Sequence, residues 1–343
     1  MQGSGQLDAG RGGGLGVYAQ WNPLELEVLH GTVMELGNKT TVTEVILVGF
    51  TGGTGPRITI FIILLLIYTA TMVGNVMMIV LVCLDRRLHS PMYFFICNLS
   101  LVETGNSSNM VPLMLVQMFS VHKSISVACC FTQYFFNIYF AANVFIFLPI
   151  MSYDRYVAIC DPLHYSTIMI NRFCIQLVIG SWLGSVFVVL YSTIITNMLP
   201  YCGPNIIDHF FCDGLAIVKL ACADTVLLGI VHLLLALVLL LSSLGFTVLS
   251  YIYIISSILR IPSTDGRQKA FSTCSSHLLM VTIVYGSAIF VEVSPALHPS
   301  AGLYKTINLF SSFLSPLMNP FVYTYRNTVF KEVLKNQVRR DAH

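Results

Sequence analysis

Seven stretches of this 343-residue chain are long and apolar enough to cross the roughly 30 Å hydrocarbon core of a bilayer. They lie near 58–84, 91–118, 127–152, 173–198, 225–258, 270–294 and 304–325. Charged residues make up only 10% of the chain, against roughly 25% in soluble domains. Backbone amides cannot stay unpaired in lipid, and these runs lack a period-two alternation. The sequence therefore predicts an all-α membrane protein, a seven-transmembrane helix bundle.

Lysine and arginine are unevenly divided between the two ends of the predicted bundle. Twelve of the 18 lie on the side that carries Arg155 and the C-terminus, and six lie on the other side. Because cytoplasmic loops carry the excess of basic residues, we expect the N-terminus outside and the C-terminus inside. The net charge of +2 is too small to indicate nucleic-acid binding, so the expected surroundings are the lipid bilayer.

The predicted spans divide the chain into three parts. Residues 1–57 are the expected extracellular tail, residues 58–326 the seven-transmembrane domain, and residues 327–343 the cytoplasmic tail. The glycine-rich segment 1–33 has no apolar core of signal-peptide length, so we interpret it as a disordered extension. Met34 begins a more ordinary sequence, and a translation start there would remove this extension.

The ten cysteines are distributed over both sides of the predicted membrane. The extracellular side is oxidising, so disulfides are expected there and free thiols elsewhere. Five cysteines fall on or near the outer face, which is enough for two bridges with one cysteine left over. Bridges of this kind would hold the loop between the fourth and fifth spans over the bundle. The five are Cys129, Cys130, Cys202, Cys212 and Cys222.

The same loop carries residue types that bind metal ions, at His209, Cys212 and Asp213. A bridged cysteine offers no thiolate, so disulfide formation is the favoured interpretation and we expect no metal or other cofactor. Of the N-glycosylation sequons in the chain, only the one at Asn38 lies in the predicted outer tail. Asn38 is therefore the expected glycosylation site.

Polar residues within the spans separate the classes of seven-helix protein. Transporters commonly contain internal repeats, and the sequence has no duplicated halves. Intramembrane proteases need two buried aspartates, or a serine with a histidine, whereas the buried acid of this chain is Glu103, so we expect no enzymatic activity. A channel would need rings of charge or a filter loop. These features favour a receptor, with a transporter or ion pathway as the alternative.

A series of polar residues runs through the predicted spans, at Asn75, Glu103, Asn143 and Asn319. Amides and an acid that face one another form interhelical hydrogen bonds, which by themselves would only hold the bundle together. Pro320 removes a backbone hydrogen bond beside Asn319 and weakens the helix there. A weak point beside a polar cluster favours a conformational switch over a purely structural role.

Five motifs occur in order along the predicted spans. They are "GN" at 74–75, "LHSPMYFFICNLSLVE" at 88–103, "MSYDRYVAICDPLHY" at 151–165, "KAFSTCSSHL" at 269–278 and "PLMNPFVYTYRN" at 316–327. Together they resemble an olfactory (odorant) receptor of the tetrapod class, within the rhodopsin-like G-protein-coupled receptors. The resemblance extends from about Met34 to Lys335 and depends on the whole set, since no single motif is specific.

The resemblance implies a switch at the inner end of the third span, at Asp154, Arg155 and Tyr156. In the resting state of such receptors, the aspartate pairs with the neighbouring arginine. On activation the arginine is released and the inner end of the sixth span moves outward, which opens a cleft for the C-terminal helix of a G-protein α subunit. The further switch residues implied are Tyr251, Tyr285, Asn319, Pro320 and Tyr323.

The resemblance also implies how the outer cysteines pair. The spacing to the Asp-Arg-Tyr motif favours Cys130 over its neighbour as the bridged cysteine of the third span. The chain departs from the family at Glu103, where aspartate is usual, and at Val144, where glutamate is common, so it does not predict a sodium or proton site. The implied disulfides are Cys130–Cys212 and Cys202–Cys222.

A ligand cavity is expected near the outer halves of the third, fifth and sixth spans. A mainly apolar cavity with a few polar groups suits small volatile molecules. Amine receptors of this superfamily have an aspartate where Asn137 stands, and opsins have a lysine where Phe313 stands, so neither amines nor retinal are expected. The predicted ligand-binding residues are Asn137, Ile138, Ala141, Ala142, His232, Ala288, Ile289 and Glu292.

These expectations combine into one predicted function. The chain would be an odorant receptor that binds an unidentified small volatile molecule, activates a stimulatory heterotrimeric G protein and raises cyclic AMP. The resemblance implies that it is a multi-pass protein of the plasma membrane, in the sensory cilia of olfactory neurons. A transporter or ion pathway with the same fold remains the alternative.

Overall fold

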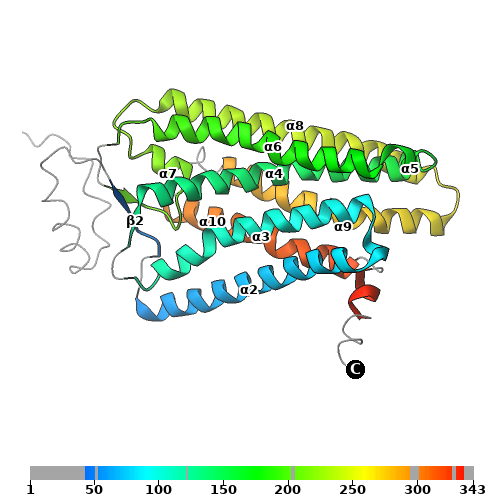
Figure 1. Cartoon of the computed structure of the whole chain (residues 1–343), viewed down its shortest axis with the longest axis horizontal. Helices are drawn as coiled ribbons and strands as arrows, with labels where there is room; N and C mark the ends of the chain where they lie inside the picture. Colours follow the sequence, from blue (N-terminus) through cyan, green and yellow to red (C-terminus); the bar gives the residue numbers. More distant parts are fainter. Residues whose placement is uncertain are drawn as a thin grey trace, which may run out of the picture. The chain divides into compact units, whose positions relative to one another are not determined.

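The computed structural model of the chain describes residues 43–50, 53–120, 123–201, 205–293, 301–326 and 330–335. Seven long helices lie alongside one another in this part of the chain (Figure 1). Their number and positions agree with the seven predicted spans. The helices are α2 (Thr54–Leu84), α3 (Pro91–Gln117), α4 (Val127–Cys160), α6 (Asn171–Asn197), α8 (Val226–Leu259), α9 (Thr264–Val293) and α10 (Ala301–Arg326).

Apolar composition and helix length separate two of these helices from the others. Helices α2, α4, α6 and α8, and the Cys274–Val293 part of α9, are each long and apolar enough to cross a membrane. Helices α3 and α10 fall outside this group, and both bury polar side chains, such as Glu103 on α3 and Asn319 on α10. Polar groups in a span are stable only when they face protein, so α3 and α10 depend on their neighbours for burial.

Helix α4 holds the bundle together. It packs against α3, α6, α8 and α9, while α10 closes the ring between α9 and α2. The largest cluster of buried apolar residues lies along this contact and includes Phe95 of α3 and Phe147 of α4, neither of which is exposed. The predicted switch motif therefore belongs to a helix that contacts four other long helices.

Helix α8 shows the pattern expected of a span whose outer face meets lipid. It turns its small polar residues Ser243, Thr247 and Ser250 inward, and these are at most 7% exposed. Several of its leucines face outward, and Leu241 is 58% exposed. Lipid tails are as apolar as leucine, so small residues that allow close packing and hydrogen bonding occupy the helix contacts instead.

The bundle has a different set of short elements at each end (Figure 1). At one end, β1 (Glu44–Leu47), β2 (Ser124–Ser126) and β3 (Ile206–Ile207) form a three-stranded sheet in the order β2-β1-β3. Strand β1 pairs antiparallel with β2 and parallel with β3. Helix α7 (Gly214–Val218) lies at the same end, which we call the disulfide end. The sequence did not predict this sheet, because its strands are too short to show a periodic pattern.

At the opposite end, α4 continues well beyond the predicted limit of the third span at residue 152. It ends at Cys160 and is followed by the short helix α5 (Tyr165–Ile168). Asp154 and Arg155 therefore lie in the last two turns of α4 and not after it, so their side chains have fixed directions on the helix. We call this the Arg155 end. A further 3-10 turn, η2 (Arg86–Leu88), connects α2 to α3.

Candidate functional site

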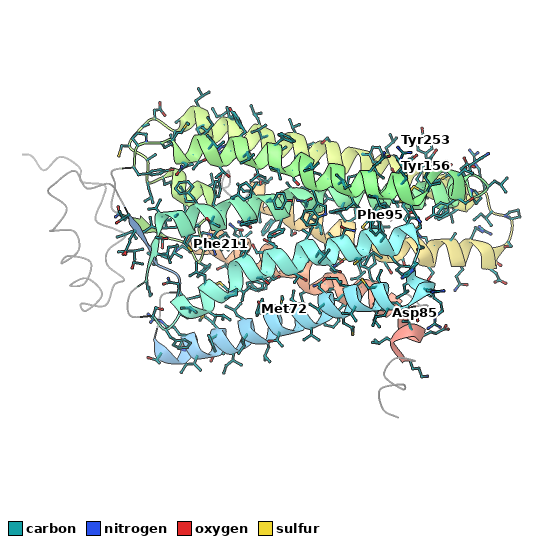
Figure 2. The ribbon with its side chains drawn as sticks, in the orientation of Figure 1. Met72, Asp85, Phe95, Tyr156, Phe211 and Tyr253 are labelled. Carbon is teal, nitrogen blue, oxygen red and sulfur yellow. A yellow bond between two sulfur atoms is a disulfide. The ribbon has the colours of Figure 1, made fainter. Side chains whose placement is uncertain are left out.

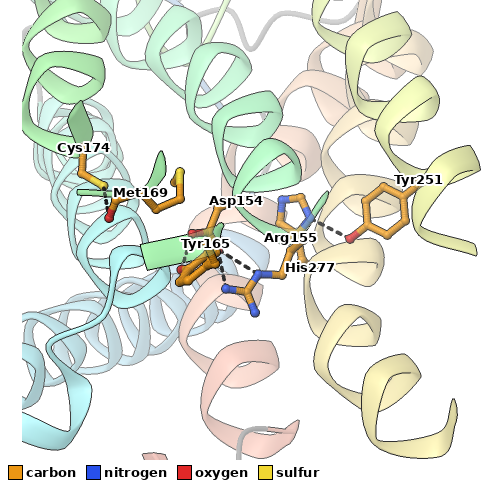
Figure 3. Close-up of polar contacts among 7 residues, drawn as sticks. All are labelled: Asp154, Arg155, Tyr165, Met169, Cys174, Tyr251 and His277. Carbon is orange, nitrogen blue, oxygen red and sulfur yellow. Dashed lines mark hydrogen bonds and ion pairs between the residues drawn. The ribbon is translucent and has the colours of Figure 1, made fainter. Parts of the chain in front are cut away.

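Asp154 and Arg155 form an ion pair at the Arg155 end of α4 (Figure 3). The Nε atom of Arg155 lies 2.9 Å from Oδ2 of Asp154, and a terminal nitrogen of the guanidinium contacts the same oxygen. The other oxygen, Oδ1, accepts a hydrogen bond from the hydroxyl of Tyr165 on α5 at 2.8 Å. Asp154 is fully buried, so it is the pairing with two donors that stabilises the carboxylate there.

Tyr165 was not among the predicted site residues, although it ends the motif that carries Asp154. Burial is the main cause that raises the pKa of Tyr165, and the Asp154 carboxylate adds to it. The phenol therefore stays protonated at neutral pH and acts as a donor. The ion pair is the contact that the resemblance implies for a resting receptor, and its role as a restraint on Arg155 remains a prediction.

A second polar contact joins α8 to α9 beside Arg155 (Figure 3). The hydroxyl of Tyr251 lies 2.8 Å from Nδ1 of His277, and the two rings stack with a 14° interplanar angle. His277 is fully buried. The sequence analysis quoted His277 within a motif without assigning it a role, although a histidine inside a span is a signal for function.

Tyr156 turns away from Asp154. Its ring packs edge-on against Tyr253 of α8, with 5.9 Å between the ring centroids, and stacks on Tyr153 at 6.3 Å (Figure 2). Asp154 and Arg155 therefore pair with each other, whereas Tyr156 contacts other tyrosines. Tyr156 joins α4 to α8 at the Arg155 end, and α8 in turn contacts α9.

Tyr285 occupies the middle of the bundle, between α4, α8 and α9. Its hydroxyl contacts Ser243 and also lies 3.3 Å from Oγ1 of Thr247. Ser243 in turn donates to the backbone carbonyl of Phe145 on α4. A change in the position of Tyr285 would therefore be felt by three helices at once, which agrees with the trigger role that the resemblance implies.

The "GN" pair on α2 contacts the proline-weakened part of α10. Pro320 has no N–H, so the carbonyl of Pro316 lacks its usual donor within the helix. Asn75 donates to that carbonyl at 2.9 Å and accepts from Asn319 at 3.0 Å. The side chain of Asn75 thus replaces the missing helix bond, and Asn319 becomes part of the same network.

Gly74 is required for this contact. A Cβ atom at position 74 would lie 2.7 Å from Cγ of Pro320. We expect Gly74→Ala to destabilise the receptor by about 1–3 kcal/mol, because two rigid helices would have to separate. The measurement is thermal unfolding of the receptor purified in detergent.

Gly180 of α6 provides the matched control for Gly74→Ala. A Cβ atom there would meet nothing within 4 Å, and alanine favours a helix more than glycine does. Gly180→Ala should therefore leave the unfolding temperature unchanged or raise it. Equal behaviour of the two variants would show that the close approach of α2 and α10 contributes nothing to stability.

The predicted series of polar residues separates into two groups. Glu103 is 1% exposed and accepts a hydrogen bond from Ser315 of α10 at 2.5 Å. Asn143 instead donates to Ser185 of α6 at 2.7 Å, so the prediction that it faces the others was wrong for this residue. The reason is rotational position, since Asn143 lies on the side of α4 that packs against α6. Tyr323 is also buried, and its hydroxyl has no hydrogen-bond partner among the described residues.

The predicted ligand residues on α4 lie in its half nearer the disulfide end. Ala142 is 3% exposed, whereas Asn137, Ile138 and Ala141 are partly buried. Their role as ligand contacts remains a prediction.

The predicted ligand residues on α9 differ in their surroundings. Ala288 packs against the main core, and Glu292 is partly buried one turn further along the helix. Ile289 is 41% exposed and shares its side of α9 with the exposed Phe290. Ile289 therefore faces away from the cluster that contains Ala288, and its proposed contact with a ligand remains a prediction.

His232 of α8 takes part in a polar contact that joins three helices. Its Nε2 atom lies 3.1 Å from the hydroxyl of Ser192 on α6, which lies 3.1 Å from the hydroxyl of Tyr134 on α4. A small gap elsewhere in the bundle contains none of the predicted ligand residues. This gap lies between α3 and α10 and is lined by Ser107, Met110, Val111, Met114, Leu309, Ser312 and Phe313.

The disulfide end confirms one of the two predicted bridges. Cys130 is bonded to Cys212, with a Cα–Cα distance of 5.4 Å, while Cys129 is free and exposed. Cys212 therefore offers no thiolate to a metal ion at this loop. Cys222 is also disulfide-bonded, but its predicted partner Cys202 lies outside the described residues, as does the predicted glycosylation site at Asn38.

Comparison with known proteins places the chain among receptors of one family. The model of the family described as "Olfactory receptor" matches residues 64–340. Human olfactory receptor 6C4 is 45% identical over 303 residues, which cover 88% of this chain and 98% of the relative. The dog olfactory receptor-like protein OLF3 is 44% identical over 298 residues, covering 87% and 94%. Mouse olfactory receptor 6E1 is 40% identical over 306 residues, covering 89% and 98%.

The family match and the structure agree in their main features. The matched residues include all of α3 to α9 and the motifs around Asn75, Arg155 and Pro320. The bundle has helices suited to crossing a membrane and the disulfide between Cys130 and Cys212. The chain belongs to the olfactory receptor family, and it is a multi-pass membrane receptor of the G-protein-coupled class and not an enzyme.

Proposed function

We propose that this odorant receptor binds a small volatile molecule between the outer halves of α4, α8 and α9, and that binding activates a stimulatory heterotrimeric G protein and raises cyclic AMP. The observation that carries the proposal is the restrained pair of Asp154 and Arg155. The pair lies beside the contact between Tyr251 and His277 that holds α8 to α9. These two contacts form a closed state that a ligand could open.

The proposed mechanism begins at Tyr285. A ligand next to Ala288 would lie about one turn above Tyr285 on α9 and would shift its ring. Because the Tyr285 hydroxyl contacts Ser243 and Thr247, that shift would change how α9 packs against α8. Movement of α9 would separate His277 from Tyr251 and free space beside Arg155. A ligand can drive this change only by the difference in its affinity for the two states.

An exposed apolar side chain supports a docking surface at the Arg155 end. Leu163 lies in the turn before α5 and is 88% exposed, more than any other large apolar residue described. Lipid explains the exposed leucines along the spans, but Leu163 follows the last turn of α4, beyond the spans. It lies close in sequence to Tyr165, which contacts Asp154. A partner that covers Leu163 would therefore also be close to the switch.

The test is an odorant panel applied to cells that express the receptor, with and without a stimulatory olfactory-type G protein α subunit. We expect at least one volatile agonist to raise cyclic AMP, and the response to require the α subunit. Ion flux or solute uptake that persists without the G protein would support the transporter or ion pathway instead. We further propose a location in the plasma membrane of sensory cilia, with the Arg155 end in the cytoplasm, and labelling of intact cells would test this orientation.

A further inference from the structure

Helix α4 contains a proline, Pro149, ahead of the turns that carry Asp154 and Arg155. The helix continues through this proline, which lies about one and a half turns before Asp154. Proline has no backbone N–H, so the carbonyl of Phe145, four residues earlier, lacks its usual donor within the helix. A backbone carbonyl in a membrane span is stable only when another group donates to it. At this turn α4 therefore needs a donor from a neighbouring helix.

Ser243 of α8 supplies this donor. Its hydroxyl donates to the carbonyl of Phe145, across the contact between α4 and α8. Ser243 is 6% exposed, so water has little access to the hydrogen bond. Side chains of neighbouring helices commonly satisfy the carbonyl that a proline leaves without a donor in a span. The backbone of α4 is therefore completed by a side chain of α8.

The same hydroxyl connects Phe145 to Tyr285 of α9. A serine hydroxyl has one proton and a carbonyl can only accept, so the proton of Ser243 goes to Phe145. The Tyr285 hydroxyl, which contacts Ser243, must then be the donor in that contact. The rings of Tyr285 and Phe145 also pack together, with 5.9 Å between their centroids. The hydrogen bonds thus run in one direction, from Tyr285 through Ser243 to the backbone of α4.

Helix α10 has a similar replaced bond, which shows what is particular to Ser243. There Asn75 of α2 donates to the carbonyl of Pro316, whose usual donor is missing because of Pro320. At Pro149 the replacing donor also accepts a hydrogen bond from a third helix, so that α4, α8 and α9 meet at one hydroxyl. Ser243 therefore combines the repair of a helix backbone with a contact to the predicted trigger.

We propose that Ser243 is a positioning residue of the switch, which replaces the hydrogen bond that Pro149 removes and so holds the Arg155 turn of α4 in its resting position. Tyr285 donates to the Ser243 hydroxyl, so a ligand that shifts Tyr285 would also disturb the bond from Ser243 to α4. The turns after Pro149 would then be held less firmly. This route from Tyr285 to Arg155 runs through α4 itself, apart from the contact between α8 and α9 at His277. It rests on the proposed function, because it assumes that release of Arg155 activates the G protein.

The experiment measures whether the effect of removing the Ser243 hydroxyl depends on Pro149. Full-length receptor with Ser243→Ala, Pro149→Ala or both is expressed with its G protein, and cyclic AMP without agonist is normalised to receptor at the cell surface. Ser243→Ala should raise this basal signal about fivefold, because the resting state loses a buried hydrogen bond. Pro149→Ala restores an N–H in α4, so adding Ser243→Ala to it should change the basal signal by less than about twofold.

Two variants of α8 are the matched controls. Ser242 is the adjacent residue, is exposed and donates to a carbonyl of its own helix, so Ser242→Ala should leave the basal signal unchanged. Thr247 contacts the Tyr285 hydroxyl at 3.3 Å, one turn along α8 from Ser243. Any effect of Thr247→Val should therefore be the same with and without Pro149→Ala.

Thermal unfolding of the purified receptor in detergent gives a second readout that needs neither agonist nor G protein. Ser243→Ala should lower the unfolding temperature more when Pro149 is present than in the Pro149→Ala receptor, since only the former leaves the carbonyl of Phe145 without a donor. A general folding defect would lower the unfolding temperature equally in both, and it could not raise the basal signal.

The inference is overturned if Ser243→Ala does not raise the basal signal per surface receptor, or raises it equally with and without Pro149→Ala. Equal losses of unfolding temperature in the two backgrounds would show that Ser243 does not replace the missing bond. A raised signal that persists when Arg155→Ala is added would show that Arg155 is not the group being positioned. The proposed function fails separately, if the surface-expressed wild type shows neither a ligand response nor a basal cyclic AMP signal that depends on Arg155.

Discussion

Arg155→Ala is expected to reduce the agonist-evoked cyclic AMP response to below about a tenth of the wild-type response, at equal surface expression. The guanidinium is the group that the resting structure restrains, through Asp154, and that the active state would present to the G protein. Removing it leaves ligand binding intact but takes away the group that the switch releases. The measurement is cyclic AMP against agonist concentration, normalised to receptor at the cell surface.

Asp154→Asn should have the opposite effect on the same switch. The amide cannot form the ion pair, although it can still accept a hydrogen bond from Tyr165. Arg155 would then be less restrained. A loss of about 1 kcal/mol in the stability of the resting state raises the ratio of active to resting receptor several-fold. We therefore expect cyclic AMP in the absence of agonist to rise several-fold over wild type. Arg87→Ala serves as the control for both variants, because Arg87 is an exposed arginine that pairs with Asp85 at the same end.

The role assigned to Arg155 would be wrong if Arg155→Ala kept a full response. Reduced basal signalling in Asp154→Asn, with normal expression, would show that the aspartate supports the active state and does not restrain it. A parallel loss in Arg87→Ala would indicate that any loss of positive charge at this end weakens coupling.

Cys130→Ser is expected to remove most of the folded receptor from the cell surface. The bridge to Cys212 closes a loop of 82 residues, and loss of a native disulfide typically costs about 2–5 kcal/mol. It also attaches the loop that carries His209 and Asp213 to α4. Surface staining and the response to any agonist of the wild type are the measurements.

Cys129→Ser is the control for the disulfide, because Cys129 is the adjacent residue of α4 and is free and exposed. It should behave like wild type. Peptide mapping without reduction that found Cys129 bridged and Cys130 free would contradict the pairing. Normal surface expression and agonist potency in Cys130→Ser would show that the bridge is dispensable.

The sequence predicted the bundle well, for a reason that applies to each span separately. Each span must bury about 20 residues in lipid with its own backbone paired, so length and apolar content are enough to find it. The prediction was less accurate for segments that lie outside the lipid. Helix α4 continues to Cys160 through Asp154 and Arg155, which low hydropathy had excluded from the span. The small sheet was missed because a few residues per strand carry no detectable period.

The candidate site was predicted in part. The pairing of Asp154 with Arg155 could be expected because the two residues are adjacent in the sequence and a family motif carries them. Their other neighbours could not be predicted in this way. Tyr165 contacts Asp154 only because the chain turns back after α4. His277 contacts Tyr251 only because α8 and α9 are each rotated so that these two side chains face one another.

The sequence by itself determined that this protein is a seven-helix membrane receptor with an adjacent aspartate and arginine at one end, because partition into lipid and adjacent charges are local properties of the chain. Only the tertiary structure decided which polar groups meet. It directed Asn143 to α6 and used Asn75 to replace the bond that Pro320 removes. Hydrogen bonds and ion pairs depend on distance and direction between residues far apart in sequence, and those are fixed only when the helices pack.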